Sequence, residues 1–308
     1  MAVTLTAVIP ATNEPPTLAR VLAAVEQADA PPEEIIVVEE PPNAGPATAR
    51  NLGSRRATGD VLVFVDADVE VRADAFARIR RAFDEDGDLV AIFGSYDDDP
   101  GARGLVSDFR NLLHHFVHHQ GAGPTATFWA GLGAIRREAF LRAGGFDEVR
   151  FPLPSIEDIE LGARLHRDGA RLVLDPTIQG KHLKQWTLRG MVDTDLRRRG
   201  VPWLRLMLED GAPSGILNLG WRHRASTVAS LVLLGGLARR NARLTVGTLG
   251  VLLALDGDFY RFLLRRRGPR QVAAGIPLHI VHRLTAVASI PIALAGHLRE
   301  RSRSRRLR

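Results

Sequence analysis

The sequence predicts an α/β domain with a mainly parallel sheet, followed by an α-helical C-terminal region that is both apolar and basic. Up to about Thr177, strand-like apolar runs alternate with stretches of helical period, which is typical of parallel-sheet domains. From Arg222 onward, apolar blocks are interrupted by arginines. We therefore divide the chain into two domains, residues 1–220 and residues 221–308.

Each element of the first domain follows from its local pattern. Runs of four to eight apolar, β-branched residues predict buried strands, and apolar residues spaced three or four apart predict helices. Pro46 suits the first turn of a helix, where its missing N–H costs nothing. The expected strands are Thr4–Ile9, Glu34–Val38, Val61–Val65 and Leu89–Tyr96, and the expected helices are Thr17–Gln27, Pro46–Arg56 and Ala73–Phe83.

Composition excludes several classes of protein. A chain of 308 residues, 45% of them hydrophobic, is large enough to bury a core without cross-links. Cysteine is absent, which excludes disulfide frameworks, thiol nucleophiles and cysteine-ligated zinc. No basic run precedes an apolar stretch at the N-terminus, so we expect no cleaved signal peptide.

Charge is distributed unevenly along the chain. The segment Arg261–Arg308 holds twelve arginines and one acid, a net charge of +11, whereas the total is +6 and the rest therefore carries −5. A basic tail of this kind binds an anionic membrane surface or a nucleic acid, or is simply solvated. No aromatic residue lies between the tail arginines, so we expect no nucleic-acid partner.

The apolar blocks of the second domain favour a membrane partner. Ala225–Ala238 and Leu244–Leu255 have 14 and 12 residues, fewer than the ~20 that span a bilayer as a helix. The third block, Ile276–Leu298, is interrupted by two prolines and a His-Arg pair. We expect a monotopic association with the membrane surface. The alternative is short buried helices packed on the α/β domain.

The strongest chemical signal is Asp66-Ala67-Asp68, directly after the apolar strand Val61–Val65. Ligands of open parallel sheets bind beyond the carboxyl ends of the strands, where these acids are expected. Hard carboxylate oxygens suit Mg²⁺ or Mn²⁺, which would bridge to a substrate diphosphate. A solvated turn is the alternative.

A second pair of acids, Glu157 and Asp158, opens an expected amphipathic helix for which Ser155 is a candidate N-cap. One of these carboxylates could act as a general base toward an acceptor hydroxyl. The alternative is that both acids only complement the helix dipole.

Order and spacing together carry a resemblance over about the first 190 residues. The sequence resembles family 2 glycosyltransferases with the Rossmann-like GT-A fold. The segments that carry it are Ala7–Pro10 with Asn13 and Glu14, Ile35–Glu40, Gly45–Asn51, Gly59–Asp68, Gly144–Glu148 and Glu157-Asp158. The resemblance implies a nucleotide-sugar donor, an inverting hexosyltransferase reaction, a DxD motif with a divalent cation, and catalysis on the cytoplasmic side.

The resemblance also implies roles for individual residues. Asp68 would bind the cation, Asp66 would approach the ribose or the cation, and Asp158 would be the base, with Glu157 as the second candidate. Donor-binding residues would be Pro10, Asn13, Glu14, Glu39 and Arg50.

Two departures from the family pattern limit what is implied. Glu39-Glu40-Pro41-Pro42 stands where the family commonly has Asp-Asp-Gly-Ser, which leaves the donor base open. The Gln-x-x-Arg-Trp signature of processive synthases is missing, so we expect a non-processive enzyme.

Five further residues are candidates for the site. Trp129 and Gly131 would lie at the donor sugar, since an indole packs on sugar rings and glycine permits close approach; a core tryptophan is the alternative. His182 resembles the histidine that several GT-A enzymes bring to the metal, with a structural role as the alternative. Trp186 and Arg189 would lie on the acceptor side.

The second domain resembles the C-terminal hydrophobic hairpin of enzymes that glycosylate lipids or polyprenyl phosphates. We therefore expect a lipid or lipid-linked acceptor at the cytoplasmic face of the plasma membrane, in a cell-envelope pathway. The alternatives are a soluble glycosyltransferase acting on a small molecule or protein, and a non-catalytic membrane scaffold. The sequence leaves the sugar, the nucleotide base and the oligomeric state open.

Overall fold

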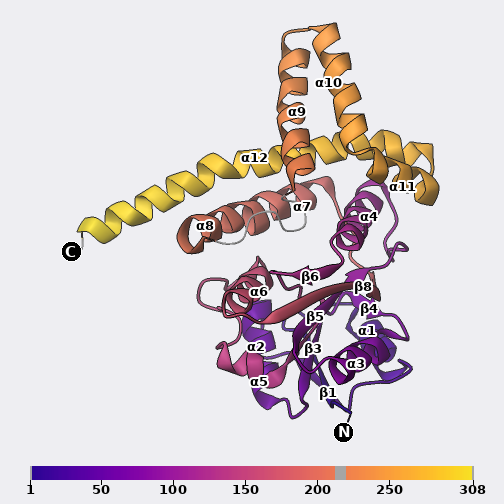
Figure 1. The fold of residues 1–308 in the computed structure, drawn as a ribbon, viewed down its shortest axis with the longest axis vertical. Coiled ribbons are helices and arrows are strands. Elements are labelled where there is room, and N and C mark those ends of the chain that lie inside the picture. The colour runs from indigo at the N-terminus through magenta and orange to yellow at the C-terminus, as the bar shows by residue number, and fades with distance from the viewer. Residues whose placement is uncertain (1, 212–219, 307–308) are drawn as a thin grey trace. The chain divides into compact units, whose positions relative to one another are not determined.

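The computed structural model describes residues 2–211 and 220–306, and these form two compact units (Figure 1). The sheet unit comprises Met1–Ala102 and Val117–Gln185. The helical unit comprises Arg103–Phe116 and Trp186–Arg308. The structure thus groups residues 186–210 with the C-terminal helices, whereas the division at residue 220 stays a prediction about where the catalytic part ends.

Within the described residues, the sheet unit contains one sheet of eight strands in the order β2-β1-β3-β7-β5-β8-β4, with β6 paired to β8. Strands β1, β2, β3, β5 and β8 run in one direction, and β4, β6 and β7 run in the opposite one. The sheet is therefore mixed but mostly parallel, as expected. The strands are β1 Leu5–Pro10, β2 Glu34–Val38, β3 Val61–Val65, β4 Val69–Val71, β5 Leu89–Tyr96, β6 Gly123–Thr125, β7 Leu132–Arg136 and β8 Arg171–His182.

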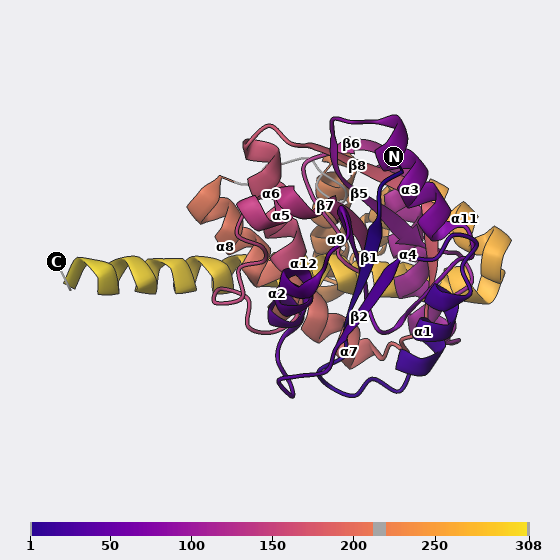
Figure 2. The same ribbon diagram turned by 90° about the horizontal axis from the view of Figure 1, so that it is seen from below.

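Helices cover both faces of this sheet (Figure 2). They are α1 Leu18–Glu26, α2 Pro46–Arg56, α3 Ala75–Glu85, α5 Arg137–Arg142, α6 Glu157–Arg167 and the last turn of α4 Leu105–Gln120. Side chains alternate along β3, so Val63 packs in the cluster with α1 and α3, while Phe64 contacts the rings of Phe140 and Phe146 on the other face. The alternation fixes the strand register, and with it the edge where Asp66 emerges.

Gly162 lets α6 pack directly on the chain before β7. A Cβ at this position would lie 2.3 Å from the backbone nitrogen of Phe128 and 2.5 Å from the carbonyl carbon of Thr127. Gly162→Ala should therefore lower the free energy of unfolding by about 3 kcal/mol, although alanine is ordinarily the better helix former. Chemical denaturation measures this loss. Gly87→Ala is the control, since nothing lies within 4 Å of its Cβ; an equal loss in both variants would contradict the packing argument.

The helical unit is built from α4 up to Phe116 and from the segments that follow Gln185. These are α7 Leu188–Asp193, the π-helix η1 Thr194–Gly200, α8 Val201–Asp210, α9 Trp221–Ala238, α10 Ala242–Leu255, α11 Gly257–Arg267 and α12 Pro269–Arg306. Phe109 and Phe116 of α4 pack on Phe259 of α11. Asp195 accepts bonds from Arg110, at 2.7 Å, and His282, also at 2.7 Å, so a buried ion pair joins α4, η1 and α12.

Helix α12 continues through the prolines that interrupt the apolar block Ile276–Leu298. Pro277 and Pro291 lie inside one continuous helix. Each proline removes one backbone hydrogen bond, and the bonds of the neighbouring turns carry the helix across. Among the described residues, Pro269–Arg299 is the one helix long and apolar enough to cross a bilayer, a test that core helices of soluble proteins also pass.

Helices α9 and α10 form an antiparallel pair with little apolar surface buried inside it. Their shared cluster contains Ala229, Leu233 and Leu252. Val228, Leu237 and Val246, in contrast, are 60%, 55% and 69% exposed. The side chains of Arg239, Arg240 and Arg243, in and beside the turn between the helices, are exposed as well. The pair is therefore an apolar surface with a basic tip.

Candidate functional site

The acids that follow β3 are held by backbone bonds. The N–H of Asp66 donates to the carbonyl oxygen of Gly131 at 3.0 Å, and the N–H of Val69 donates to the carbonyl of Asp66 at 2.9 Å, closing a tight turn. The N–H of Leu183, just after β8, donates to the carbonyl of Asp68 at 2.8 Å. Both carboxylates remain partly exposed at the carboxyl end of β3, as the strand pattern predicts.

His182 lies beside Asp68, with 3.5 Å between its Nε2 and Oδ2 of the carboxylate. Its ring stacks on Tyr96, with centroids 4.1 Å apart and planes 8° from parallel. Burial alone would raise the pKa of Asp68, but the hydrogen bond and charge of His182, together with the charge of Lys184, lower it. Lys181, on the other face of β8, pairs with Asp99 at 2.7 Å. Lys184 is thus the lysine whose charge acts on the Asp68 carboxylate.

Arg50 lies between the two acidic motifs. Its Nη2 is 2.6 Å from Oδ1 of Asp66, and its Nη1 is 2.9 Å from Oε1 of Glu157, while its side chain is only 4% exposed. Burial raises the pKa of Asp66, against the opposing charge of Arg50. The sequence assigned Arg50 to the donor; the structure gives its guanidinium two carboxylate partners within the protein.

Glu157 and Asp158 have different surroundings in the structure. Glu157 is buried against Arg50, and its Oε2 also accepts the N–H of Ser155 at 2.9 Å. Asp158 is half-buried and accepts the N–H of Ala130 at 3.1 Å through Oδ2 and that of Ile159 at 2.8 Å through Oδ1. Ser155 is not the N-cap: Ile156 holds that position, and its apolar side chain makes no cap bond.

The indole of Trp129 lies against Gly131. The backbone of this short segment bonds to both Asp66 and Asp158. A Cβ on Gly131 would lie 2.4 Å from Cζ2 of the Trp129 ring, so only glycine leaves room for the indole there. The indole packs edge-on against Tyr96, with centroids 4.9 Å apart. Trp129 is partly buried at the margin of the core, so both interpretations of the sequence, a core tryptophan and a sugar platform, match its place.

The expected donor-binding loops follow β1 and β2. The N–H of Ala11 donates to the carbonyl of Val38 at 2.8 Å, and that of Asn43 donates to the carbonyl of Thr12 at 2.7 Å, which ties the two loops together. Asn13, Glu14 and Glu39 are exposed in these loops, and Pro10 ends β1 half-buried. The donor-binding role of these residues stays a prediction.

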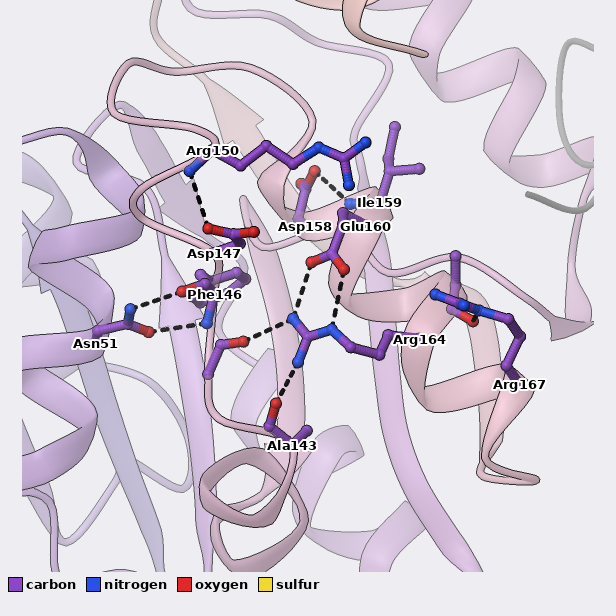
Figure 3. Close-up of polar contacts among 12 residues, drawn as sticks. Asn51, Ala143, Phe146, Asp147, Arg150, Asp158, Ile159, Glu160, Arg164 and Arg167 are labelled. Atoms are coloured by element: carbon purple, nitrogen blue, oxygen red, sulfur yellow. Dashed lines mark hydrogen bonds and ion pairs between the residues drawn. The ribbon is translucent and has the colours of Figure 1, made fainter. Parts of the chain in front are cut away.

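A polar network holds the loop that leads into α6 (Figure 3). The Asn51 side chain pairs with both backbone groups of Phe146, each at 2.9 Å. Arg164 of α6 binds Glu160 and donates to the carbonyls of Ala143 and Gly145. Gly145 itself has φ of +73°, a conformation that favours glycine. The network therefore holds the Gly-Gly-Phe-Asp segment between α2 and α6.

Trp186 and Arg189 belong to the helical unit. The backbone N–H of Trp186 donates to Oγ of Ser107 at 2.8 Å, and the Arg110 guanidinium lies 5.4 Å from the indole centroid. Arg189 is exposed in α7. That these two residues contact the acceptor stays a prediction.

The protein side chains alone do not form a full metal cage. Among the described residues, no group of three or more His, Cys, Asp or Glu side chains is arranged to hold a metal ion. Asp68, with its lowered pKa, is nevertheless charged and partly exposed next to His182 and Asp66. One or two carboxylates completed by substrate phosphates are the usual setting of Mg²⁺ in proteins. The side chains of Asp68, Asp66 and His182 therefore fit a cation whose remaining ligands come from a diphosphate.

Tyr96 is the contact that the sequence analysis missed. Its ring lies between His182 and Trp129, two candidates that were found separately. It stands at the end of β5 without a recognisable motif around it. Its position at a strand's carboxyl end was the one available signal.

Comparison with known proteins gives a consistent assignment. Residues 38–143 match the family model described as Glycosyl transferase family 2. Pre-mycofactocin glycosyltransferases from two strains of Mycobacterium tuberculosis are 28% identical to the chain over 179 residues, covering 51% of this chain and 35% of theirs. The match thus spans about a third of the length of these curated relatives.

The fold has a similar counterpart among solved structures. A mannosyltransferase from Pyrobaculum calidifontis, solved in complex with GDP-Man and Mn²⁺, superposes with a TM-score of 0.59 at 20% identity, over 90% of this chain and 86% of that one. The expected fold class is confirmed, as is the resemblance from which it came. The chain therefore has the fold of GT-A glycosyltransferases, and residues 38–143 within it match the model of family 2.

Proposed function

We propose that this protein is an inverting, non-processive glycosyltransferase that uses a nucleotide-sugar donor and a divalent cation. The observation that carries the proposal is the placement of three acids around one short segment. Asp66 donates its N–H to Gly131, Asp158 accepts the N–H of Ala130, and Asp68 lies two residues beyond Asp66. The DxD segment and the candidate base are thus both bonded to the backbone of adjacent residues, Ala130 and Gly131.

The donor would bind across the carboxyl ends of the strands. Asp68, with Asp66 and His182, would hold Mg²⁺ or Mn²⁺ on the donor diphosphate, and the bound cation would neutralise the negative charge of the leaving nucleotide. The loops with Pro10, Asn13, Glu14 and Glu39 would line the nucleoside, and Trp129 would pack on the sugar ring. The similarity to a mannosyltransferase solved with GDP-Man and Mn²⁺ supports this arrangement.

Asp158 would act on the acceptor. Its carboxylate takes the proton of an acceptor hydroxyl while the hydroxyl oxygen forms a bond to the anomeric carbon. The bond from that carbon to the diphosphate breaks on the opposite side, so the configuration inverts and the nucleoside diphosphate leaves with the bonding electrons. The two backbone N–H bonds, one to each carboxylate oxygen, hold the Asp158 carboxylate in place.

A screen of nucleotide sugars tests the proposed activity. Purified protein should be stabilised thermally by one nucleoside diphosphate sugar together with Mn²⁺ or Mg²⁺, and should slowly hydrolyse it. EDTA should abolish both effects, because it removes the cation that the carboxylates and the donor diphosphate would bind together. A protein that neither binds nor hydrolyses any donor in the screen would favour the non-catalytic scaffold.

We further propose a lipid or lipid-linked acceptor at the cytoplasmic face of the membrane. Exposed apolar side chains on α9 and α10, the basic tip of that pair and the apolar helix α12 support a membrane partner. The last residues of the basic tail, 307–308, lie outside the described residues. Deleting the C-terminal helices would also uncover Phe109 and Phe116, so point substitutions are the sharper test.

Substituting the arginines of the tip should weaken membrane binding. Each arginine near an anionic surface contributes about 1 kcal/mol, so replacing Arg239, Arg240 and Arg243 with glutamine should reduce binding roughly 100-fold. Sedimentation with vesicles of equal phosphatidylglycerol and phosphatidylcholine measures this. The control replaces Arg55, Arg56 and Arg81, which are exposed on the sheet unit, and removes the same charge. Equal losses in both variants would indicate nonspecific attraction, and no binding by the unchanged protein would exclude the membrane partner.

A non-lipid acceptor is the second candidate. The similarity to pre-mycofactocin glycosyltransferases favours it, because their name gives pre-mycofactocin, and no lipid, as what they act on. Detergent-free cell fractionation distinguishes between a lipid and a non-lipid acceptor. Recovery of the full-length protein in the soluble fraction, with transfer to a water-soluble acceptor, would support this candidate.

A further inference from the structure

We infer that Arg50 is a positioning residue that holds the two acidic motifs at a fixed separation. Its guanidinium bonds to Asp66 on one side and to Glu157 on the other, at 2.6 and 2.9 Å. The inference rests on the proposed function and assigns a task to the first acid of each motif. Asp66 and Glu157 anchor their segments to Arg50, and Asp68 and Asp158 are left for the cation and the base.

The link is stiff because it is buried and doubly charged. Arg50 and Glu157 are 4% and 6% exposed, so breaking the bond between them would leave the Glu157 carboxylate as an uncompensated charge away from water. Both oxygens of Glu157 are engaged, one by Arg50 and one by the Ser155 N–H. Glu157 is therefore held in place at the first turn of α6, immediately before Asp158.

A planar guanidinium is required for this geometry. Two nitrogen atoms of one rigid group reach carboxylates that are 91 positions apart in the sequence, one just after β3 and one in α6. A lysine at the same place has a single ammonium at the end of a flexible stem, and it could not keep both carboxylates at the same separation. Arg50→Lys therefore preserves the charge and removes the positioning.

The variants Arg50→Lys and Glu157→Gln test the inference, with Arg164→Lys as the matched control. Arg164 also ties α6 to a neighbouring loop, through Glu160 and the carbonyls of Ala143 and Gly145, but bonds to neither acidic motif. The first readout is amide hydrogen exchange in the unliganded protein. The second is calorimetric binding of Mn²⁺ with GDP and, separately, with UDP. The third is kcat with the donor that the screen identifies.

Arg50→Lys should raise amide exchange about tenfold at residues 66–68 and at 156–159 together. It should also weaken binding of the Mn²⁺–nucleotide at least fivefold and lower kcat at least tenfold, because the segments that carry Asp68 and Asp158 are then no longer held in fixed positions. Glu157→Gln should change the same quantities in the same direction. The double variant should be within about twofold of Arg50→Lys, since Glu157 acts through Arg50. Arg164→Lys should raise exchange at 143–148 alone.

Different outcomes overturn the inference. If Arg50→Lys weakened nucleotide binding but left kcat and exchange at 156–159 unchanged, Arg50 would be a donor contact. If the effects of Arg50→Lys and Glu157→Gln multiplied fully, the two residues would act independently. Should Arg50→Lys fail to fold, Glu157→Gln carries the same readouts. If the unchanged protein bound no nucleotide, the proposed function would fail, while hydrogen exchange would still decide whether the link exists.

Discussion

Replacing Asp158 with asparagine should lower kcat by about 10²- to 10⁴-fold and change donor affinity by less than about twofold. The amide keeps the shape of the side chain but cannot take the acceptor proton. Proton removal matters only while the acceptor attacks, so donor binding is spared. Steady-state kinetics with saturating acceptor, combined with calorimetry of the donor, separates the two quantities.

The control for this variant is Asp86→Asn. Asp86 also accepts two backbone N–H bonds through its carboxylate, from Asp88 and Leu89, but it lies at the end of α3. Each variant should therefore lose a similar amount of stability, about 1 kcal/mol, and only Asp158→Asn should lose turnover. Equal losses of affinity and turnover at Asp158 would make it a binding residue, and normal turnover would transfer the role of base to Glu157.

Replacing Asp68 with asparagine should weaken cation-dependent nucleotide binding by at least about 100-fold. The volume is unchanged, but the neutral amide no longer supplies the charge that a divalent cation requires. Calorimetry of Mn²⁺ or Mg²⁺ with GDP and with UDP measures the loss. Nucleotide binding without any cation should change little.

Asp99→Asn is the control for the Asp68 variant. It removes a carboxylate that pairs with Lys181, on the face of β8 away from His182. Its effect on cation-dependent binding should be small. If Asp68→Asn bound Mn²⁺ and nucleotide as tightly as the unchanged protein, the cation would be held elsewhere and the assignment would be wrong.

Local patterns predicted the elements whose causes are local. Strands β2, β3 and β5 and helix α2 begin and end at the expected residues, because each is an uninterrupted apolar run or opens on a proline. The antiparallel insertion of β7 between β3 and β5 depends on pairing between distant segments, and no short pattern encodes it. Helix α12 continues through Pro277 and Pro291, because a proline weakens a helix but does not always end it.

The sequence predicted which acids belong to the candidate site, but not the side-chain contacts that join them. Asp66, Asp68 and Asp158 follow a strand end and a helix start, which are visible in the sequence. The partners of Arg50 lie 16 and 107 positions away, so its role depends on the fold. The stacking of His182 on Tyr96 likewise joins two strands that pair only in the folded sheet.

The segment between Trp129 and Gly131 binds both acidic motifs through main-chain atoms. A peptide N–H and a peptide carbonyl are present whichever side chains these positions carry. Side chains here could therefore change during evolution, and alter which sugar is accepted, without releasing either acid. One restriction applies: glycine at position 131 is needed only while the indole of Trp129 occupies the space above it. Among related enzymes with different sugars, these two positions should vary together.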